Sequence, residues 1–336
     1  MRAVEIRGAF GLDNLALVER PDPRPGPGQV LVRLRAASLN YRDLLMAEGK
    51  YNPKQKLPLI PCSDGAGEVV EAGEGVTRVR PGDRVCTLFA QKWIAGTPTR
   101  EKLRSTLGGP LDGTLAELAV FDEEAVVHAP AHLSDEEAAT LPCAALTAWS
   151  ALVTEGGVKA GDTVLVQGTG GVSLFALQFA KALGARVIAT SSQDEKLARV
   201  RGMGAAEGIN YREVPEWGVR AKELAGGEGV DHVVEVGGAG TLQQSLKALR
   251  FGGTVSLIGN LAGTKAEILL TQIFMQNIRV NGILVGHRES FEAMNRAIAL
   301  HGLRPVIDRA FPLEESPAAL RHMAAGGHFG KIVVTL

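Results

Sequence analysis

Hydrophobic and polar positions follow one period near the start of the chain and another beyond it. In residues 30–35, VLVRLR, apolar positions alternate with charged ones, and a period of two is typical of a half-buried strand. Further short strands are predicted at residues 68–70, 83–89 and 115–120, with glycine and proline turns between them. Many short strands joined by such turns predict a small barrel-like β domain in residues 1–124.

From Ser134 onward, strand patterns alternate with helix patterns. The sequence SDEE at residues 134–137 is a capping box, which predicts the start of a helix. Apolar runs bounded by glycine then predict six strands, at residues 163–167, 186–190, 208–210, 231–235, 254–258 and 279–285. Buried strands alternating with helices predict a parallel sheet covered on both faces, and six of them predict the doubly wound, dinucleotide-binding arrangement.

The tail after residue 288 is too short to form a domain of its own. A helix (291–300), a strand (306–311), a helix (316–325) and a strand (331–336) are predicted there, and we expect them to complete the first domain. The prediction is an α/β protein with one domain from 1–124 and 288–336 and a dinucleotide-binding domain from 125–287. Two domains agree with 336 residues at about 100–200 residues per domain.

Charge and cysteine content exclude several classes of function. The chain has 36 Lys and Arg against 37 Asp and Glu, so no global field attracts nucleic acid or an anionic membrane. No apolar signal segment is seen at the N-terminus, and Cys62, Cys86 and Cys143 are few and scattered, which favours a reducing, cytoplasmic location. The uncharged runs 138–154 and 163–180 contain proline or glycine, so no membrane span is expected.

The strongest motif is GTGGVS at residues 168–173, which follows a predicted strand and opens a predicted helix. Its first glycine suits a tight turn, its second lets backbone N–H groups approach a pyrophosphate, and the helix N-terminus adds positive potential. A lone glycine fingerprint is weak, and the alternative is a glycine-rich turn without a ligand. With this context we predict a dinucleotide site that includes Gly168, Gly170, Gly171 and Val172.

The end of the next strand favours NADP(H) over NAD(H). An acidic residue about 20 residues after the glycines binds the ribose 2′-OH of NAD, but Ser191 occupies that position. Ser191 and Ser192 can donate hydrogen bonds to a 2′-phosphate, Lys196 adds a positive charge, and Tyr211 ends the following strand nearby. Two observations keep the choice open: the serines can instead cap a helix, and Asp194 is a carboxylate close by.

Together these features resemble the medium-chain dehydrogenase/reductase superfamily over essentially the whole chain. NYRD at residues 40–43, EGKY at 48–51, LPC at 141–143 and the two serines at 191–192 resemble its zinc-free, quinone-reductase-like branch. The resemblance implies a GroES-like β-barrel domain, a Rossmann domain that binds NADP(H), and an oxidoreductase activity.

The comparison with zinc alcohol dehydrogenases of that superfamily implies that zinc is absent. Their catalytic zinc is held by two cysteines and a histidine, and the matching positions here are Asn40, Ser63 and Cys143. One thiolate cannot complete a tetrahedral zinc site, and residues 89–115 lack the cysteines of the structural-zinc lobe. A site made of Cys62, Asp64 and Cys143 remains the alternative.

A metal-free site favours a conjugated acceptor, because the negative charge that a hydride brings is then delocalised and hydrogen-bond donors suffice. We therefore expect NADPH-dependent reduction of a quinone or an α,β-unsaturated carbonyl. By resemblance to enoyl-thioester reductases, Tyr51 is the proton donor, or else a phenol packed at a turn. Asn40 and Arg42 are alternative donors that Asp43 can orient, unless they only hydrogen-bond within the loop. The competing functions are an alcohol dehydrogenase and a non-catalytic NADPH-binding protein.

By resemblance, further cofactor contacts lie at the carboxyl ends of later strands and in the tail. They are Gly237, Gly259, Asn260, Val285, His287 and Lys331. For His287 a capping or surface role is the alternative, and Trp93 either lines the substrate cleft or is an ordinary packed aromatic residue.

Residues 279–285 are expected to form an exposed edge of the sheet. An apolar edge is prone to pairing unless it is matched by its own copy, so we predict a homodimer through this strand. The expected partners are a small-molecule substrate and a second copy of the chain, with no nucleic acid or membrane.

Overall fold

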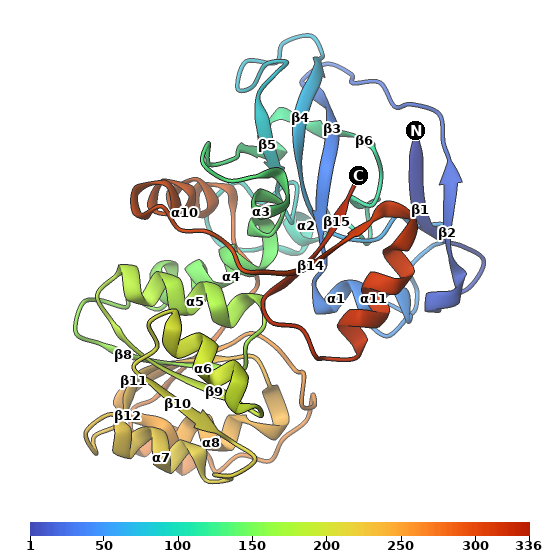
Figure 1. Cartoon of the computed structure of the whole chain (residues 1–336). Helices are drawn as coiled ribbons and strands as arrows, with labels where there is room; N and C mark the ends of the chain where they lie inside the picture. Colours follow the sequence, from blue (N-terminus) through green and yellow to red (C-terminus); the bar gives the residue numbers. More distant parts are fainter. The chain divides into compact units, whose positions relative to one another are not determined.

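Figure 1 shows the computed structural model, which describes all 336 residues. The chain divides into unit 1, Met1–Leu146 with Gly286–Leu336, and unit 2, Thr147–Val285. It therefore leaves the first unit once and returns to it. The expected domain limits, 1–124 with 288–336 and 125–287, stay a prediction. In the structure, the first unit continues to Leu146 and resumes at Gly286.

Unit 1 is built on a seven-stranded sheet in which β14, β15, β3, β4, β5 and β7 are neighbours in that order and β6 also pairs with β3. The red strands β14 and β15 of the C-terminal tail lie beside the blue strand β3 in Figure 1, and β15 pairs antiparallel with β3. The tail thus completes the GroES-like unit, as predicted. The bounds are β3 (Gln29–Ser38), β4 (Asp64–Ala72), β5 (Arg84–Thr87), β6 (Leu118–Asp122), β7 (Val126–His128), β14 (Ile307–Pro312) and β15 (Lys331–Thr335).

Helices and a second, two-stranded sheet complete unit 1. The sequence pattern did not predict the hairpin of β1 (Arg2–Ile6) and β2 (Leu15–Glu19), nor the short strand β7. It did predict the capping box at Ser134, which opens α3. The α-helices are α1 (Tyr41–Ala47), α2 (Arg100–Leu103), α3 (Asp135–Ala139), α10 (Arg288–His301) and α11 (Ser316–Ala324); the 3₁₀ turns are η1 (Leu12–Asn14), η2 (Glu123–Ala125) and η6 (Leu313–Glu315).

A continuous helical stretch joins α3 to the second unit. It contains the π-helical segment η3 (Leu141–Ala145), then α4 (Leu146–Trp149), then a second π-helical segment, η4 (Ser150–Thr154). Pro142 lies in the first turn of η3, where the absence of an N–H costs no helical hydrogen bond. The uncharged run 138–154 is therefore helical, and no helix of the structure is both long and apolar enough to cross a membrane.

Unit 2 has a six-stranded parallel sheet with the order β10-β9-β8-β11-β12-β13. From β8 the chain adds β9 and then β10 on one side, and it then returns to add β11, β12 and β13 on the other side. This is the predicted doubly wound arrangement, in which ligands bind where the strand order reverses, between β8 and β11. The bounds are β8 (Thr163–Gln167), β9 (Arg186–Ser191), β10 (Glu207–Asn210), β11 (Val230–Glu235), β12 (Leu249–Leu257) and β13 (Arg279–Gly282).

Two strand predictions need correction in their limits. Strand β12 begins at Leu249, earlier than expected, and β13 ends at Gly282 although the pattern predicted a strand to residue 285. Val285 has a φ of 45°, which a β-strand cannot accommodate, so the apolar run continues while the strand does not.

Helices cover both faces of this sheet. Helices α5 and α6 contact β9, while α7 and α8 pack against each other, and α8 contacts β11 and β12. The side chains of Leu174, Phe175, Leu177 and Phe179 on α5 are buried. The bounds are α5 (Gly171–Ala182), α6 (Asp194–Gly202), α7 (Trp217–Leu224), η5 (Gly238–Gly240), α8 (Leu242–Ala248) and α9 (Leu270–Met275).

Candidate functional site

The glycine loop joins β8 to α5 and leaves open space at the start of the helix. Gly168 has a φ of 68°, a conformation that favours glycine. A Cβ atom added to Gly168 or Gly170 would meet no other atom within 4 Å. Ser173 is buried and its hydroxyl donates to the Gln167 carbonyl at 2.5 Å, which brings the helix close to the strand. The Gly168 N–H donates to the Thr190 carbonyl at 2.8 Å. The N–H groups of the first turn of α5, which have no partner within the helix, offer positive potential for a pyrophosphate.

A buried polar network at the ends of β8 and β11 was not predicted from the sequence. Gln167 Nε2 donates to Glu235 Oε2 and to the Ser245 hydroxyl, both at 2.6 Å. Glu235 Oε1 accepts the Gly237 N–H at 2.8 Å and the Thr241 hydroxyl at 2.6 Å. The only signal in the sequence was that each of two apolar strands ends in a polar residue. The network fixes the loop that carries Gly237, an expected cofactor residue.

The residues expected at the adenosine 2′-position come together at the ends of β9 and β10. The Tyr211 N–H donates to the Ser191 carbonyl at 3.1 Å. The Ser191 hydroxyl accepts the Gln193 N–H at 3.3 Å. Gln193 is itself the N-cap of α6, and no side chain caps that helix, so the serine does not act as the cap. A hydroxyl group that accepts still has a proton to donate. Ser192 is half-buried beside it, and Lys196 lies further along α6.

Asp194, the residue that argued against NADP(H), has a partner of its own. It lies in the first turn of α6, and its Oδ1 accepts a hydrogen bond from Asn210 Nδ2 at 2.9 Å. No carboxylate occupies the end of β9 itself, where Ser191 is the last residue. The local residues therefore fit a phosphorylated ribose.

The remaining expected contacts in unit 2 follow β12 and β13. A Cβ on Gly259 would approach the Val236 carbonyl to 2.4 Å, so only glycine fits there. Asn260 is exposed, and Val285 is buried with a positive φ. A β-branched residue in that region is an outlier of the kind that concentrates at functional sites.

His287 and Trp93 form a packed pair within unit 1. His287 is the N-cap of α10 and accepts the Ser290 N–H through Nδ1 at 3.2 Å. Its ring centroid lies 5.9 Å from that of Trp93. Trp93 is 5% exposed and donates its indole N–H to the Gly96 carbonyl at 2.7 Å. The helix-capping and packing alternatives are thus both present in the structure.

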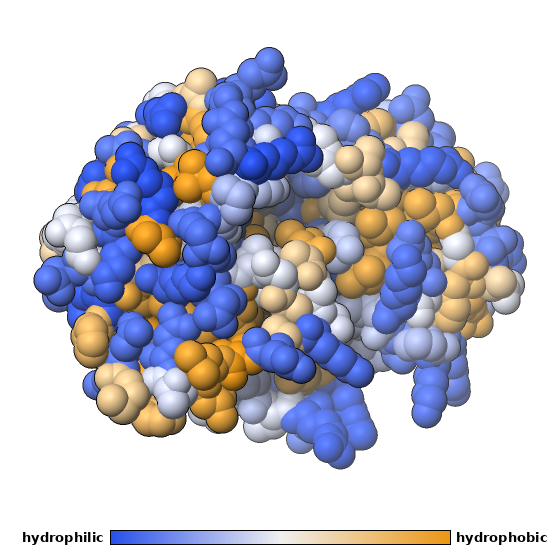
Figure 2. All heavy atoms as spheres, turned by 90° about the horizontal axis from the view of Figure 1, so that it is seen from below, coloured by the Kyte–Doolittle hydropathy of each residue, from blue (hydrophilic) through white to orange (hydrophobic).

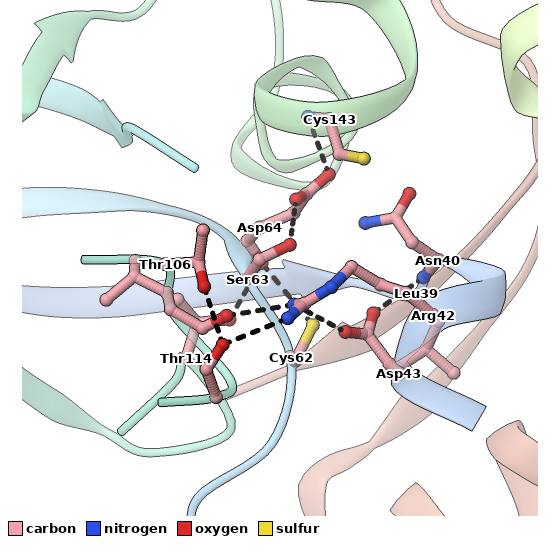
Figure 3. A network of polar contacts seen from close by, with 12 residues as sticks. Leu39, Asn40, Arg42, Asp43, Cys62, Ser63, Asp64, Thr106, Thr114 and Cys143 are labelled. Atoms are coloured by element: carbon pink, nitrogen blue, oxygen red, sulfur yellow. Dashed lines mark hydrogen bonds and ion pairs between the residues drawn. The ribbon is translucent and has the colours of Figure 1, made fainter. Parts of the chain in front are cut away.

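Three of the expected catalytic residues, Asn40, Arg42 and Asp43, lie in a buried polar cluster of unit 1, shown in Figure 3, whereas Tyr51 is 48% exposed. Asn40 begins α1, and its N–H donates to Asp43 Oδ2 at 2.8 Å. Figure 3 also shows Asp64, which accepts the Ser63 hydroxyl at 2.7 Å and the Cys143 N–H at 3.1 Å. The Asp64 carboxylate thus joins β4 to η3, and the Asn40–Asp43 bond closes the start of α1 beside them.

Burial sets the charge state of the two carboxylates. Desolvation raises the pKa of Asp43 to about 6, against the opposing effect of the Arg42 guanidinium. Desolvation also raises the pKa of Asp64 above its usual value, although the Lys331 ammonium favours the charged form. Repulsion by the Asp64 carboxylate raises the pKa of Asp43 further. The cluster therefore balances two acidic side chains against two basic ones.

Lys331 is buried inside this cluster, and the sequence did not predict that position. It is 4% exposed, and its Nζ donates to the Leu39 carbonyl at 2.5 Å and to Asn40 Oδ1 at 2.6 Å. The Asn40 amide is thereby oriented with Nδ2 away from Lys331, and Nδ2 is shielded from solvent without a hydrogen-bond partner.

The zinc-ligand positions do not fit a metal ion. Asn40 Oδ1 accepts from Lys331, and the Ser63 hydroxyl donates to Asp64. Cys143 is the only cysteine among these three positions, and one thiolate cannot complete a tetrahedral zinc site. The alternative set fails as well, because Cys62 donates to the Ser38 carbonyl at 3.2 Å. No group of three His, Cys, Asp or Glu side chains is placed to hold a metal.

The doubly wound sheet with its open glycine loop, and the polar cluster in the other unit, define a dinucleotide-dependent oxidoreductase. Residues 26–131 match the alcohol dehydrogenase GroES-like domain, and residues 171–299 match the zinc-binding dehydrogenase family. The chain belongs to the medium-chain dehydrogenase/reductase superfamily, whose members bind NAD(P).

Two curated relatives match almost the whole chain. A zinc-type alcohol dehydrogenase-like protein of Schizosaccharomyces pombe is 44% identical over 97% of this chain and 96% of its own length. An acryloyl-coenzyme A reductase of Metallosphaera sedula is 32% identical and is matched over 100% of both chains.

Two solved structures show the same fold. An NAD-dependent alcohol dehydrogenase superposes with a TM-score of 0.92 and 34% identity, over 100% of both chains. A crotonyl-CoA carboxylase/reductase in complex with NADP has a TM-score of 0.88 and 25% identity, over 100% of this chain and 95% of its own. Family and fold thus agree with an oxidoreductase.

Proposed function

We propose that the protein is an NADPH-dependent, metal-free reductase of α,β-unsaturated carbonyls or quinones. The observation that carries the proposal is the combination of an open dinucleotide loop with metal-ligand positions that are already engaged. Asn40 Oδ1 accepts a hydrogen bond from Lys331, and both the Ser63 hydroxyl and the Cys143 backbone N–H donate to Asp64. The names of the acryloyl-CoA and crotonyl-CoA reductases among its relatives support an activated C=C bond as the acceptor.

The cofactor residues divide by the part of NADPH that they would hold. The N–H groups at the start of α5 would bind the pyrophosphate, and the polar groups at the ends of β9 and β10 would bind the 2′-phosphate. The loops after β11, β12 and β13 would face the nicotinamide end. In this order the residues are Gly168, Gly170, Gly171 and Val172; Ser191, Ser192, Lys196 and Tyr211; and Gly237, Gly259, Asn260 and Val285.

The reduction requires a hydride and a proton. When bound, NADPH supplies the hydride to the β-carbon of the acceptor. The C=C electron pair then moves toward the carbonyl oxygen, and the α-carbon must receive a proton. Tyr51 is the donor that the geometry supports best, because its side chain is 48% exposed and its phenol can regain a proton from water. The N–H groups of Arg42 donate to protein carbonyls, and the Nδ2 of Asn40 is shielded.

Turnover with matched substrates tests this function. We expect NADPH to be oxidised faster than NADH, with enoyl thioesters, 2-alkenals or benzoquinones as acceptors and not with simple ketones. Tyr51→Phe should lower kcat, whereas Tyr41→Phe, which changes another half-exposed phenol of unit 1, serves as the control. Stoichiometric zinc together with chelator-sensitive oxidation of alcohols would refute the proposal.

An alcohol dehydrogenase is the second candidate function. It is favoured by the names of the Schizosaccharomyces pombe relative and of the NAD-dependent structure. The same assays separate the two, because an alcohol dehydrogenase would reduce simple ketones or oxidise alcohols. Binding of NADPH without turnover of any acceptor would instead identify a non-catalytic NADPH-binding protein.

We also propose a homodimer through β13. Figure 2 shows that apolar groups are exposed in patches on one face of the molecule. In unit 2, large apolar side chains are more than 40% exposed on and around α9 and β13, and none of the α9 residues is buried. These side chains are Phe251, Leu261, Leu269, Leu270, Phe274, Met275, Val280 and Leu284. Light scattering at micromolar concentration should give twice the 35.4 kDa chain mass, and a monomer would reject the proposal.

A further inference from the structure

Arg42 lies between two aromatic rings of unit 1. Its guanidinium carbon is 4.9 Å from the ring centroid of Tyr51 and 5.0 Å from that of Phe89. Both distances are within the range in which a cation is attracted to the face of an aromatic ring. Of the two rings, Phe89 is 3% exposed and Tyr51 is 48% exposed. A fixed inner ring, a cation and a half-exposed outer ring therefore form a sandwich.

The guanidinium at the centre of the sandwich is fixed by other contacts. Arg42 Nη1 donates to the Leu107 carbonyl at 2.9 Å, and Nη2 donates to the Gly109 carbonyl at 3.2 Å. The carboxylate of Asp43 lies 3.6 Å from Nη1. The side chain is only 9% exposed, and Nε, which has no partner, is shielded from solvent. Arg42 is therefore held by two backbone carbonyls and a carboxylate, and little of its side chain is exposed to a substrate.

The main chain of Tyr51 is anchored by a hydrogen bond, whereas its side chain depends on the contact with the Arg42 guanidinium. The Tyr51 N–H donates to the Leu45 carbonyl at 3.1 Å, at the end of α1, which anchors the main chain of the turn. Gly49, with a φ of 70°, starts that turn, because a left-handed residue commonly ends a helix. The Tyr51 side chain, by contrast, projects from the turn with half of its surface exposed, so that one face of its ring meets the guanidinium.

We propose that Arg42 is a positioning residue that holds the Tyr51 ring in place for proton transfer and does not itself donate the proton. This inference rests on the proposed role of Tyr51 in the reduction. Attraction to a desolvated cation restricts the ring to one position, and misplacement of a reacting group by about 1 Å can cost about a hundredfold in rate. A buried arginine beside the site thus acts on the reaction only through the exposed phenol.

The first test measures the ring position without turnover. The chain has three tyrosines, so protein labelled with 3-fluorotyrosine gives three ¹⁹F resonances, which Tyr→Phe variants assign. Arg42→Gln keeps an N–H group for the carbonyls but removes the charge. We expect it to move the Tyr51 resonance toward that of free fluorotyrosine and to narrow it, while the Tyr211 resonance stays unchanged. Arg309→Gln, which removes the guanidinium 4.6 Å from the Phe311 ring, is the matched control and should change neither resonance.

The second test is kinetic. Arg42→Gln should lower kcat about ten- to hundredfold with little change in the KM for NADPH, and Arg42→Lys, which restores a cation, should recover part of the loss. In Arg42→Gln/Tyr51→Phe the two losses should not add, since residues that act as a unit are not additive. If Arg42→Gln does not fold by circular dichroism, Arg42→Lys and Phe89→Leu carry both measurements.

The outcomes separate this inference from the proposed function. A Tyr51 resonance that stays in place in the folded Arg42 variants overturns the positioning role, whatever the turnover. Fully additive losses of kcat also overturn it, because Arg42 would then act without Tyr51. If the Tyr51 resonance moves in the Arg42 variants but Tyr51→Phe keeps full activity, Tyr51 is not the proton donor. The proposed function is then wrong at that step, and the positioning role of Arg42 in proton transfer is wrong as well.

Discussion

Replacement of Asp43 by asparagine is expected to stabilise the protein at neutral and alkaline pH. Desolvation raises the pKa of this carboxyl from 3.8 to about 6, although Arg42 favours the charged form. The folded state therefore binds its proton more tightly than the unfolded state does. At about 1.36 kcal/mol per pKa unit, the ionised form of Asp43 costs about 3 kcal/mol of stability, and the asparagine avoids most of that cost.

The sign of the pH dependence follows from linkage. Between pH 3.8 and 6 the folded state holds more protons than the unfolded state, so stability falls as pH rises through this window. The advantage of Asp43→Asn should thus be about 3 kcal/mol at pH 8 and about half of that at pH 5. Asparagine also keeps an oxygen to accept the Asn40 N–H, which Asp43 accepts at 2.8 Å.

Urea unfolding of both proteins at pH 5, 6, 7 and 8 measures the difference directly. Asp83→Asn is a control with the opposite expected sign. The Arg80 N–H donates to the Asp83 carboxylate and lowers its pKa. Replacement of this carboxylate should therefore destabilise the protein at pH 8 and have a smaller effect in acid. If Asp43→Asn were no more stable than the wild type at pH 8, or if its advantage did not shrink with falling pH, the carboxylate would not be strained by burial and the reasoning would fail.

Three further predictions concern cofactor choice, the buried lysine and a buried histidine. Ser191→Asp should raise the KM for NADPH at least tenfold and improve the use of NADH, because a carboxylate repels the 2′-phosphate and binds the 2′-OH; steady-state kinetics with Ser191→Asn as the neutral control checks this. Lys331→Met leaves the buried Leu39 carbonyl without its donor, so the free energy of unfolding should fall by about 1–3 kcal/mol in urea titrations. Desolvation lowers the pKa of His232 to about 4 from 6.5, so stability should be lost as pH falls through that window, and His232→Gln should reduce the loss in pH-dependent melting curves.

The sheet of unit 2 was predictable because its central strands contain apolar segments, such as residues 164–166 in β8 and 187–189 in β9, and because connections between parallel strands require helices. The same kind of signal placed the glycine loop and the returning tail. What it could not give was the end of β13: residues 283–285 are apolar, but the strand ends at Gly282, and Val285 has a φ of 45°. An apolar residue type reports neither strand pairing nor burial at this edge, where Val280 and Leu284 are more than 40% exposed.

Long-range polar pairing limited the prediction of the site. Asn40 and Lys331 are 291 residues apart, and Gln167 and Glu235 are 68 apart, so no local spacing relates them. The sequence singled out the NYRD motif, and the structure places Asn40, Arg42 and Asp43 of that motif in the polar cluster; their catalytic role stays a prediction. Lys331 was expected beside the cofactor by resemblance, whereas its ammonium is hydrogen-bonded to Leu39 and Asn40 within unit 1. Its contact with a cofactor stays a prediction.

The charge balance of the polar cluster explains why a metal site is not one substitution away. Two buried acidic groups, Asp43 and Asp64, face two buried basic groups, Arg42 and Lys331. A divalent cation added there would leave uncompensated positive charge in a desolvated place, which costs several kcal/mol. Compensation would require ionisation of Cys143, which burial opposes, and removal of the Lys331 ammonium from Asn40. Restoring cysteine and histidine at positions 40 and 63 alone should therefore bind zinc weakly, and the same variant with Lys331→Met should bind it more tightly.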